Sequence, residues 1–309
     1  MTDSLRALRR TATRFAIAQA IAMTARLPIG LQGSAVRSML TLVGSNPLLR
    51  RHVRENMRLA LGRDAPAGAE RLYFRHLGWF LSNALPVFHQ GLAATRVAEQ
   101  VKFDQSIHIL DEAVAERRGV VFTSPHWSGH ELMAAVVNRI HPMAMLVRQA
   151  STAEQAARKL QWYSALGAEI VLRAGGAATI EDAAASLRAL KSGRLLAITP
   201  DLLAGPEEGV EVRIFRRPAR LHGGAFAFAL AARAPVICGS CRWQDDSSVM
   251  ITFERAAPMP DTGDRASIIR AAAQDWCRWL EDKLAASPEN WLFWLDKRWS
   301  HFLRDAPLA

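Results

Sequence analysis

The sequence predicts an α/β fold in which a mostly parallel central sheet is flanked by helices and preceded by a helical N-terminal region. From about residue 118 onward, short and continuously apolar runs alternate with stretches of helical periodicity. This alternation is typical of parallel strands that are buried on both faces. Before residue 100, prolines divide apolar segments that never alternate with a period of two, which indicates helices joined by turns.

The expected elements follow from these patterns in chain order. Residues 1–100 are predicted to form helices that are interrupted near Pro28, Pro47, Pro66 and Pro86. Buried strands are expected at 119–124, 144–148, 168–172, 194–199, 235–243 and 248–255. Helices are expected at 129–140, 152–166, 177–191, 222–233 and 265–286, and a loop at 205–209. We expect a separate segment over 1–35 and a single domain over 36–309, helical over 36–117 and α/β over 118–309.

Composition and charge exclude several classes of protein. Half of the 309 residues are apolar, which argues against disorder, and three Cys are too few for a disulfide-stapled scaffold. The net charge is +10, and residues 1–63, with eleven Arg against two acidic residues, supply +9 of it. The remaining chain is therefore nearly neutral. Nucleic-acid binding is not expected, because the basic residues lack interleaved aromatics and match no known module.

The basic N-terminal segment has the pattern of a membrane-associating helix. Arg6, Arg10 and Arg14 share one helical face, and the apolar stretch from Phe15 to Ala25 is shorter than a membrane span. A basic amphipathic helix on an anionic membrane surface is therefore expected within residues 1–35. An ordinary surface helix and a signal peptide are the alternatives.

The stretch with the most chemical information surrounds His126. A buried strand is expected to end at Ser124-Pro125, which puts His126 at its carboxyl end, where α/β sheets bind ligands. Glu131 falls in the first turn of the following helix. A carboxylate bonded to one imidazole nitrogen leaves the other nitrogen free to accept a proton, which is general-base chemistry on a hydroxyl.

Other interpretations of this stretch remain open. Ser128-x-x-Glu131 has the spacing of a capping box, in which Glu131 only closes the helix start. His126, His130 and Glu131 are also candidate ligands of a metal-dependent hydrolase.

Cys238 and Cys241 lie on an expected strand and are interpreted as buried structural thiols. No glycine pair has dinucleotide-binding or P-loop spacing, so no cofactor is expected.

Four further blocks accompany the His126 block in order along the chain. They are Arg54-Glu-Asn56-Met-Arg58, Val147-Arg148, the run from Leu190 through Gly193 to Pro200-Asp201, and Pro288-Glu289-Asn290-Trp291 with Arg298-Trp299. Together they resemble the bacterial lipid A late acyltransferases, the lauroyl/myristoyl class, which are lysophospholipid-acyltransferase-like. The chain departs from that pattern at Val147, where the family usually has an aromatic residue, and at Ile214-Phe215-Arg216, where it often has Phe-Phe-Gly.

The resemblance implies a glycerolphosphate-acyltransferase-like fold and an enzyme of the inner membrane's cytoplasmic face. It would transfer a fatty acyl chain from acyl carrier protein or acyl-CoA to a hydroxyl of a lipid A precursor or related glycolipid. His126 would be the general base and Glu131 its orienting partner, with no metal. Substrate-binding positions carried over are Arg148 and Asp201, with Arg158 and Arg173 both matching a further family arginine. The alternative for Arg148 and Asp201 is a mutual or local salt bridge that shapes the pocket.

Two more groups invite an interpretation. Arg216, Arg217 and Arg220 form a second basic cluster, which would hold acceptor phosphates, dock an acidic carrier protein, or lie in a solvated loop. Five tryptophans gather near the C-terminal end, and their spacing favours a core-facing stripe over membrane anchors. A non-catalytic protein that binds a membrane surface is the third hypothesis for function, beside the acyltransferase and the metal-dependent hydrolase.

Overall fold

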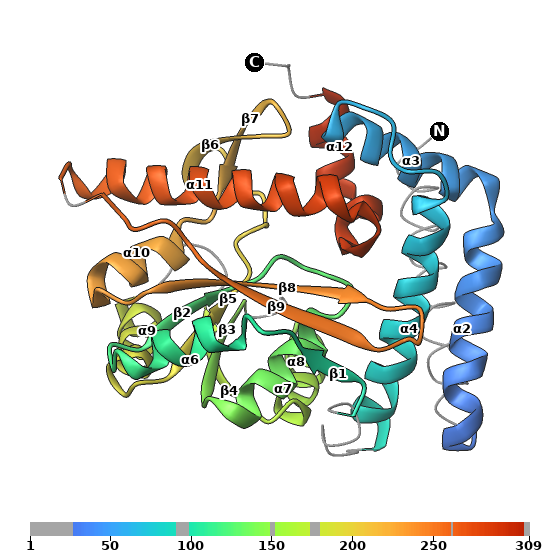
Figure 1. The fold of residues 1–309 in the computed structure, drawn as a ribbon, viewed down its shortest axis with the longest axis horizontal. Helices are drawn as coiled ribbons and strands as arrows, with labels where there is room; N and C mark the ends of the chain where they lie inside the picture. Colours follow the sequence, from blue (N-terminus) through green and yellow to red (C-terminus); the bar gives the residue numbers. More distant parts are fainter. Residues whose placement is uncertain (1–26, 91–98, 149–151, 174–179, 261, 306–309) are drawn as a thin grey trace.

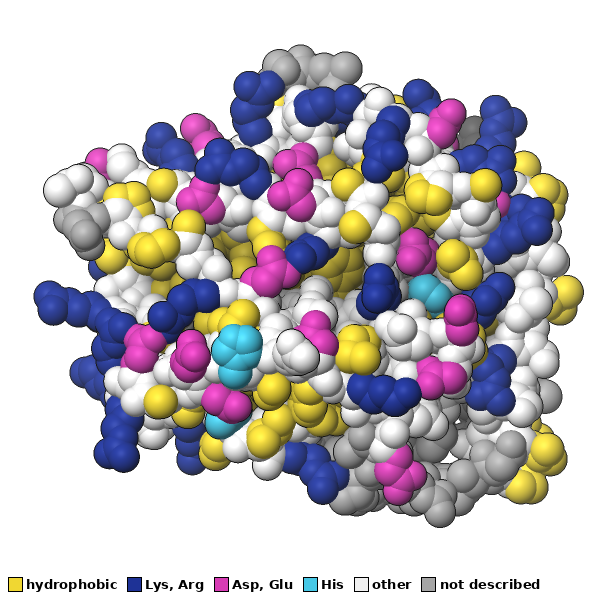
Figure 2. All heavy atoms as spheres, in the orientation of Figure 1, with side chains coloured by type: hydrophobic (Ala, Val, Ile, Leu, Met, Phe, Trp, Pro, Cys, Tyr) yellow, Lys and Arg dark blue, Asp and Glu magenta, His cyan; other side chains and the backbone are white. Residues whose placement is uncertain are grey.

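The computed structural model describes residues 27–90, 99–148, 152–173, 180–260 and 262–305. The basic N-terminal segment expected within residues 1–35 lies largely outside these ranges. Within the described ranges, no helix combines the length and the apolar character needed to cross a membrane. Lys and Arg are interspersed with Asp and Glu over the face shown in Figure 2, in keeping with a nearly neutral body.

The N-terminal region is helical, as predicted. It consists of α2 (Ile29–Ser45), α3 (Pro47–Leu61) and α4 (Ala69–Gln90), and α2 packs along α4 at one end of the molecule (Figure 1). The start of α3 follows from its sequence, because Asn46 accepts from the N–H of Leu48 at 2.9 Å and Pro47 occupies the first turn. The helix ends at Gly62, whose φ of +70° favours glycine.

A seven-stranded, mostly parallel sheet forms the centre of the fold and confirms the predicted class. Its spatial order is β1-β9-β8-β2-β5-β3-β4, and the only antiparallel pair among these described strands is β8–β9. All six predicted strands are present, and the short β1 was not foreseen. The strands are β1 (Val101–Phe103), β2 (Val120–Thr123), β3 (Met143–Arg148), β4 (Glu169–Arg173), β5 (Leu195–Ile198), β8 (Val236–Trp243) and β9 (Val249–Arg255).

Helices cover both faces of this sheet (Figure 1). Below it lie α6 (Ile107–Ala115), α7 (His130–Ile140) and α8 (Ala153–Ala165), and above it lie α10 (Gly224–Ala232) and α11 (Arg265–Ala286). Helix α9 (Ile180–Lys191) contacts α10. The chain leaves β2 toward α7 on one face and continues after β5 toward α10 on the other. The carboxyl ends of the neighbouring strands β2 and β5 therefore form a topological switch point, where such sheets bind ligands.

A separate hairpin of β6 (Val210–Ile214) and β7 (Arg217–Leu221) corrects the interpretation of the basic cluster. The solvated-loop alternative is wrong for Arg217 and Arg220, which lie on β7, whereas Arg216 lies exposed in the two-residue turn at a φ of +61°. Arg216 and Arg217 both donate to the carbonyl oxygen of Leu59, in the last turn of α3, and so satisfy an exposed helix end. Arg220 pairs with Glu211 at 2.6 Å.

The five tryptophans near the C-terminal end pack into the core of the protein. The C-terminal segment contains the short helices η1 (Pro288–Asn290) and η2 (Leu292–Leu295), followed by α12 (Lys297–Asp305). The core-facing interpretation is confirmed, since four of the five tryptophans are at most 2% exposed and Trp279 is partly buried. The buried four are Trp276, Trp291, Trp294 and Trp299. Cys238 and Cys241 are also buried, as predicted, and burial raises the pKa of the Cys238 thiol to about 12.

Candidate active site

His126 lies in a tight turn at the carboxyl end of β2. The N–H of Trp127 donates to the carbonyl of Pro125 at 2.7 Å, which closes a three-residue turn centred on His126. The His126 side chain keeps 22% of its surface exposed. Its backbone carbonyl accepts from the N–H of Leu292 at 2.9 Å, and its ring lies 4.5 Å, centroid to centroid, from that of Phe293. The C-terminal segment thus fixes the turn while part of the imidazole remains accessible.

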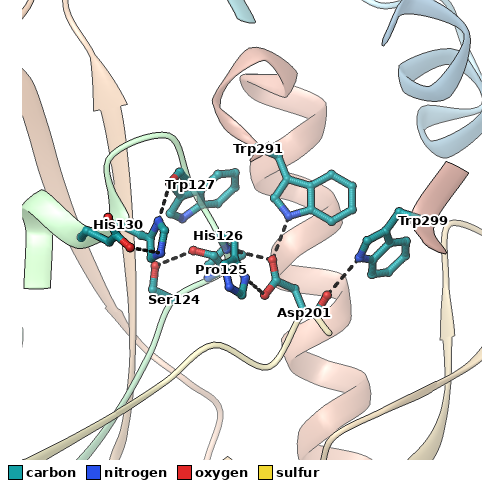
Figure 3. Close-up of polar contacts among 9 residues, drawn as sticks. Ser124, Pro125, His126, Trp127, His130, Asp201, Trp291 and Trp299 are labelled. Carbon is teal, nitrogen blue, oxygen red and sulfur yellow. Dashed lines mark hydrogen bonds and ion pairs between the residues drawn. The ribbon is translucent and has the colours of Figure 1, made fainter. Parts of the chain in front are cut away.

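Asp201 is the carboxylate that meets the Nδ1 atom of His126 (Figure 3). One carboxylate oxygen lies 2.7 Å from Nδ1, and the other accepts from the backbone N–H of His126 at 2.8 Å. The parallel pairing of β2 with β5 explains why these two side chains are in contact. Thr123 of β2 and Ile198 of β5 are register partners, and His126 and Asp201 each follow three residues later.

Two tryptophans hold Asp201 in place from its other side. Trp291 Nε1 donates to the Asp201 carboxylate at 2.9 Å, and Trp299 Nε1 donates to the Asp201 backbone oxygen at 3.1 Å (Figure 3). Asp201 is completely buried. This network gives each carboxylate oxygen at least one donor, as a buried carboxylate requires.

The electrostatics of the pair determine which imidazole nitrogen is available. Burial would raise the pKa of Asp201, but the charge of His126 and the hydrogen bonds from His126 and Trp291 outweigh it and lower that pKa. The ionised carboxylate can only accept, so Nδ1 of His126 carries the proton. The Nε2 atom of a neutral imidazole is then left as a proton acceptor.

Glu131 lies in the first turn of α7, as predicted, with 12% of its side chain exposed. Burial raises its pKa to about 7, while a hydrogen bond with Trp162 and then the charge of His126 oppose that rise. The capping-box alternative is wrong, because the N-cap is Gly129 and the Ser128 hydroxyl accepts from Trp243 Nε1 at 3.1 Å instead. The role of Glu131 as an orienting partner of His126 stays a prediction.

The raised pKa of Glu131 makes stability depend on pH. Between its ordinary value of 4.5 and about 7, the folded protein binds a proton that the unfolded chain has released, so stability falls as pH rises. Glu131→Gln has no such proton. We expect urea unfolding to show similar stability for both proteins at pH 4.5 and the variant more stable by about 3 kcal/mol at pH 8. Parallel pH profiles for the two proteins would contradict this assignment of the pKa.

His130, the third member of the metal-site alternative, is engaged elsewhere. Its Nδ1 lies 2.8 Å from the carbonyl oxygen of Trp127, and its Nε2 lies 4.0 Å from a Glu131 oxygen. Burial and the neighbouring His126 lower the pKa of His130 to about 3, so the ring is neutral at pH 7. No group of three or more His, Cys, Asp or Glu side chains within the described ranges is arranged to hold a metal ion.

The predicted arginines lie at the same edge of the sheet as His126 and Asp201. Arg148 ends β3 and Arg173 ends β4, and the two are register partners. In the order β2-β5-β3-β4, four neighbouring strands therefore present His126, Asp201, Arg148 and Arg173 at their carboxyl ends. The mutual form of the alternative salt bridge is wrong, since Asp201 is bonded to His126 and Trp291 and not to Arg148. The Arg158 side chain, on α8, lies outside the described residues.

The match to known proteins agrees with this arrangement. A family model of the bacterial lipid A biosynthesis acyltransferases matches residues 2–301. The chain belongs to this family. Membership confirms the resemblance that the sequence blocks indicated and supports an acyltransferase of lipid A biosynthesis. A search of the curated proteins found no match.

Two of the lipid A acyltransferase blocks have structural roles in this chain. Asn56, from the Arg-x-Asn block, is completely buried and donates to the Trp294 carbonyl at 2.8 Å and to the Ser300 hydroxyl at 2.9 Å. Trp291, from the Pro-Glu-x-Trp block, orients Asp201. The sequence pattern indicated neither of these roles nor the pairing of Asp201 with His126. The one available signal was the equal spacing of His126 and Asp201 from the ends of their strands.

Proposed function

We propose that the protein transfers a fatty acyl chain from an acyl thioester to a hydroxyl of a lipid A precursor or related glycolipid. The donor is acyl carrier protein or acyl-CoA. The observation that carries the proposal is a partly exposed imidazole whose Nδ1 is held by a buried, ionised carboxylate, in a chain of the lipid A acyltransferase family.

The proposed reaction needs no covalent acyl-enzyme. Nε2 of His126 removes the proton from the acceptor hydroxyl as its oxygen attacks the thioester carbonyl. The new ester C–O bond forms through a tetrahedral intermediate, the C–S bond then breaks, and the thiolate takes the proton back from His126. Asp201 stabilises the imidazolium that exists between these two proton transfers.

The other groups at this edge are proposed to assist. Arg148 and Arg173 supply positive charge where the thioester oxygen or the acceptor becomes negative. Glu131, buried next to His130, is proposed to orient the imidazole from the helix side, as the family resemblance implies. The basic N-terminal segment would keep the enzyme on the anionic cytoplasmic face of the inner membrane, at about 1 kcal/mol for each basic residue near the lipid.

Mass spectrometry tests the proposal in two settings. Purified protein is incubated with a lipid A precursor and either acyl carrier protein or CoA thioester, and the lipid should gain the mass of one acyl group. Membranes of a deletion strain should contain a lipid that lacks one acyl group. An unchanged lipid profile in the deletion strain, together with no transfer from either donor, would overturn the proposal. It would favour the non-catalytic membrane-binding hypothesis.

A further inference from the structure

Two buried polar side chains of α4 contact the segment that holds the candidate active site. Tyr73 and His76 lie about one helical turn apart, so they share one face of α4, and they are 2% and 5% exposed. Helix α4 lies beside the C-terminal segment and contacts η1 (Figure 1). Neither side chain takes part in the proposed proton transfers. Apolar residues would serve a helix that only packs, because a buried hydroxyl or imidazole costs free energy unless it is hydrogen-bonded.

The segment that they contact, residues 290–292, is paired with the turn that carries His126. The Leu292 N–H donates to the His126 carbonyl at 2.9 Å, and the Ser128 N–H donates to the Asn290 carbonyl at 2.6 Å. These two hydrogen bonds flank an isolated antiparallel β-bridge. The position of the His126 turn therefore depends on the position of residues 290–292.

The two α4 side chains hold this segment at both of its ends. The Tyr73 hydroxyl donates to the Leu292 carbonyl at 3.1 Å. His76 Nδ1 lies 3.0 Å from Asn290 Oδ1, and since an amide oxygen can only accept, Nδ1 carries the proton and donates it. Burial lowers the pKa of His76 to about 4, although this hydrogen bond opposes the shift, so the ring is neutral at pH 7. The residue between the two contacts is Trp291, whose indole donates to the buried carboxylate.

We propose that Tyr73 and His76 are positioning residues for acyl transfer. Acting through residues 290–292, they set the distance between the imidazole of His126 and the carboxylate of Asp201. The inference rests on the proposed function and adds to it two residues that lie outside the sheet. Small displacements matter here, because a shift of about 1 Å between reacting groups can lower a rate by about 10²-fold.

Kinetics of matched variants test the proposal first. His76→Phe keeps an aromatic ring against Trp79 but cannot donate a hydrogen bond, and we expect kcat to fall at least about tenfold while KM changes less than about threefold. His76→Asn can donate from its amide nitrogen and should recover most of the loss. Tyr73→Phe should lower kcat as His76→Phe does. Ser186→Ala is the control and should leave kcat unchanged, because it removes a buried hydroxyl that donates to a backbone carbonyl within α9.

A second comparison separates positioning from a loss of folded protein. The effect of His76→Phe is measured again in the Asp201→Asn background, where the orientation of the imidazole is already lost. We expect kcat to change there by less than about twofold, because both substitutions disturb the same interaction. A variant that only lowered the amount of folded enzyme would lower kcat by the same factor in both backgrounds. That equal loss, or an unchanged kcat in both His76→Phe and Tyr73→Phe, would overturn the proposal.

A third readout does not require acyl transfer. The proton that His126 Nδ1 shares with Asp201 should give a downfield ¹H NMR signal, assigned by its loss in Asp201→Asn. His76→Phe should shift or broaden this signal, whereas His76→Asn and Ser186→Ala should leave it in place. An identical signal in His76→Phe would overturn the proposal. A wild-type protein that transfers no acyl group, in which His76→Phe still shifts the signal, would refute the proposed function and leave the contact through residues 290–292 intact.

Discussion

His126→Ala is expected to lower kcat for acyl transfer by about 10⁴-fold. Without the imidazole, there is no Nε2 atom to accept the proton of the acceptor hydroxyl. General-base catalysis of this kind typically contributes a factor of about 10²–10⁴ to the rate. The side chain is partly exposed, so its removal leaves little buried space unfilled. The rate is measured by mass spectrometry of the acylated lipid, with circular dichroism as the check on folding.

A suitable control replaces the neighbouring imidazole. His130→Gln retains a side chain that can donate to the Trp127 carbonyl and leaves His126 and Asp201 in place. We expect it to keep most of the activity. If His126→Ala folds normally and transfers acyl groups at more than about a tenth of the wild-type rate, His126 is not the general base.

Asp201→Asn is expected to lower kcat by about 10³-fold with a smaller change in KM. The asparagine amide can donate to Nδ1, which would place the ring proton on Nε2 and remove its ability to accept. Asparagine also loses the negative charge that stabilises the imidazolium. Because His126 and Asp201 act as a unit, the double variant should be no slower than His126→Ala alone.

Glu131→Gln gives the matched comparison for this prediction. Both substitutions convert a carboxylate near His126 into its amide, but Asp201 alone is seen to contact Nδ1 directly. If Asp201 orients the ring, Asp201→Asn should be much slower than Glu131→Gln. The reverse order of rates would contradict the role of Asp201 and assign the orientation of His126 to Glu131.

The sequence pattern predicted the elements that carry apolar runs. All six strands expected from such runs are present, from β2, which is buried throughout, to the edge strand β4, in which Val171 is the one buried residue. The hairpin β6–β7 was missed because its strands carry charged residues. Val212 and Ile214 nevertheless alternate with Glu211 and Arg213 in the pattern of a half-buried strand. Strand β1 has three residues, one of which is Lys102, and so offers too short a pattern to detect.

The site was predictable residue by residue but not as an assembly. His126, Arg148, Asp201 and Arg173 were all expected in the site, and their presence at one edge depends on the strand order β2-β5-β3-β4. Local sequence does not specify that order, so it could not reveal that Asp201 meets Nδ1. The hydrogen bond from Trp291 to Asp201 joins residues 90 positions apart, and no periodic pattern in the sequence indicates a contact over that separation.

The dependence of Asp201 on Trp291 and Trp299 also bears on when the enzyme becomes active during its synthesis. A chain that the ribosome has completed only through α11 already contains the sheet, His126 and Asp201. It lacks both indole donors and the Leu292 N–H that fixes the His126 turn. Translation would therefore have to pass residue 299 before every hydrogen bond that positions His126 and Asp201 can form.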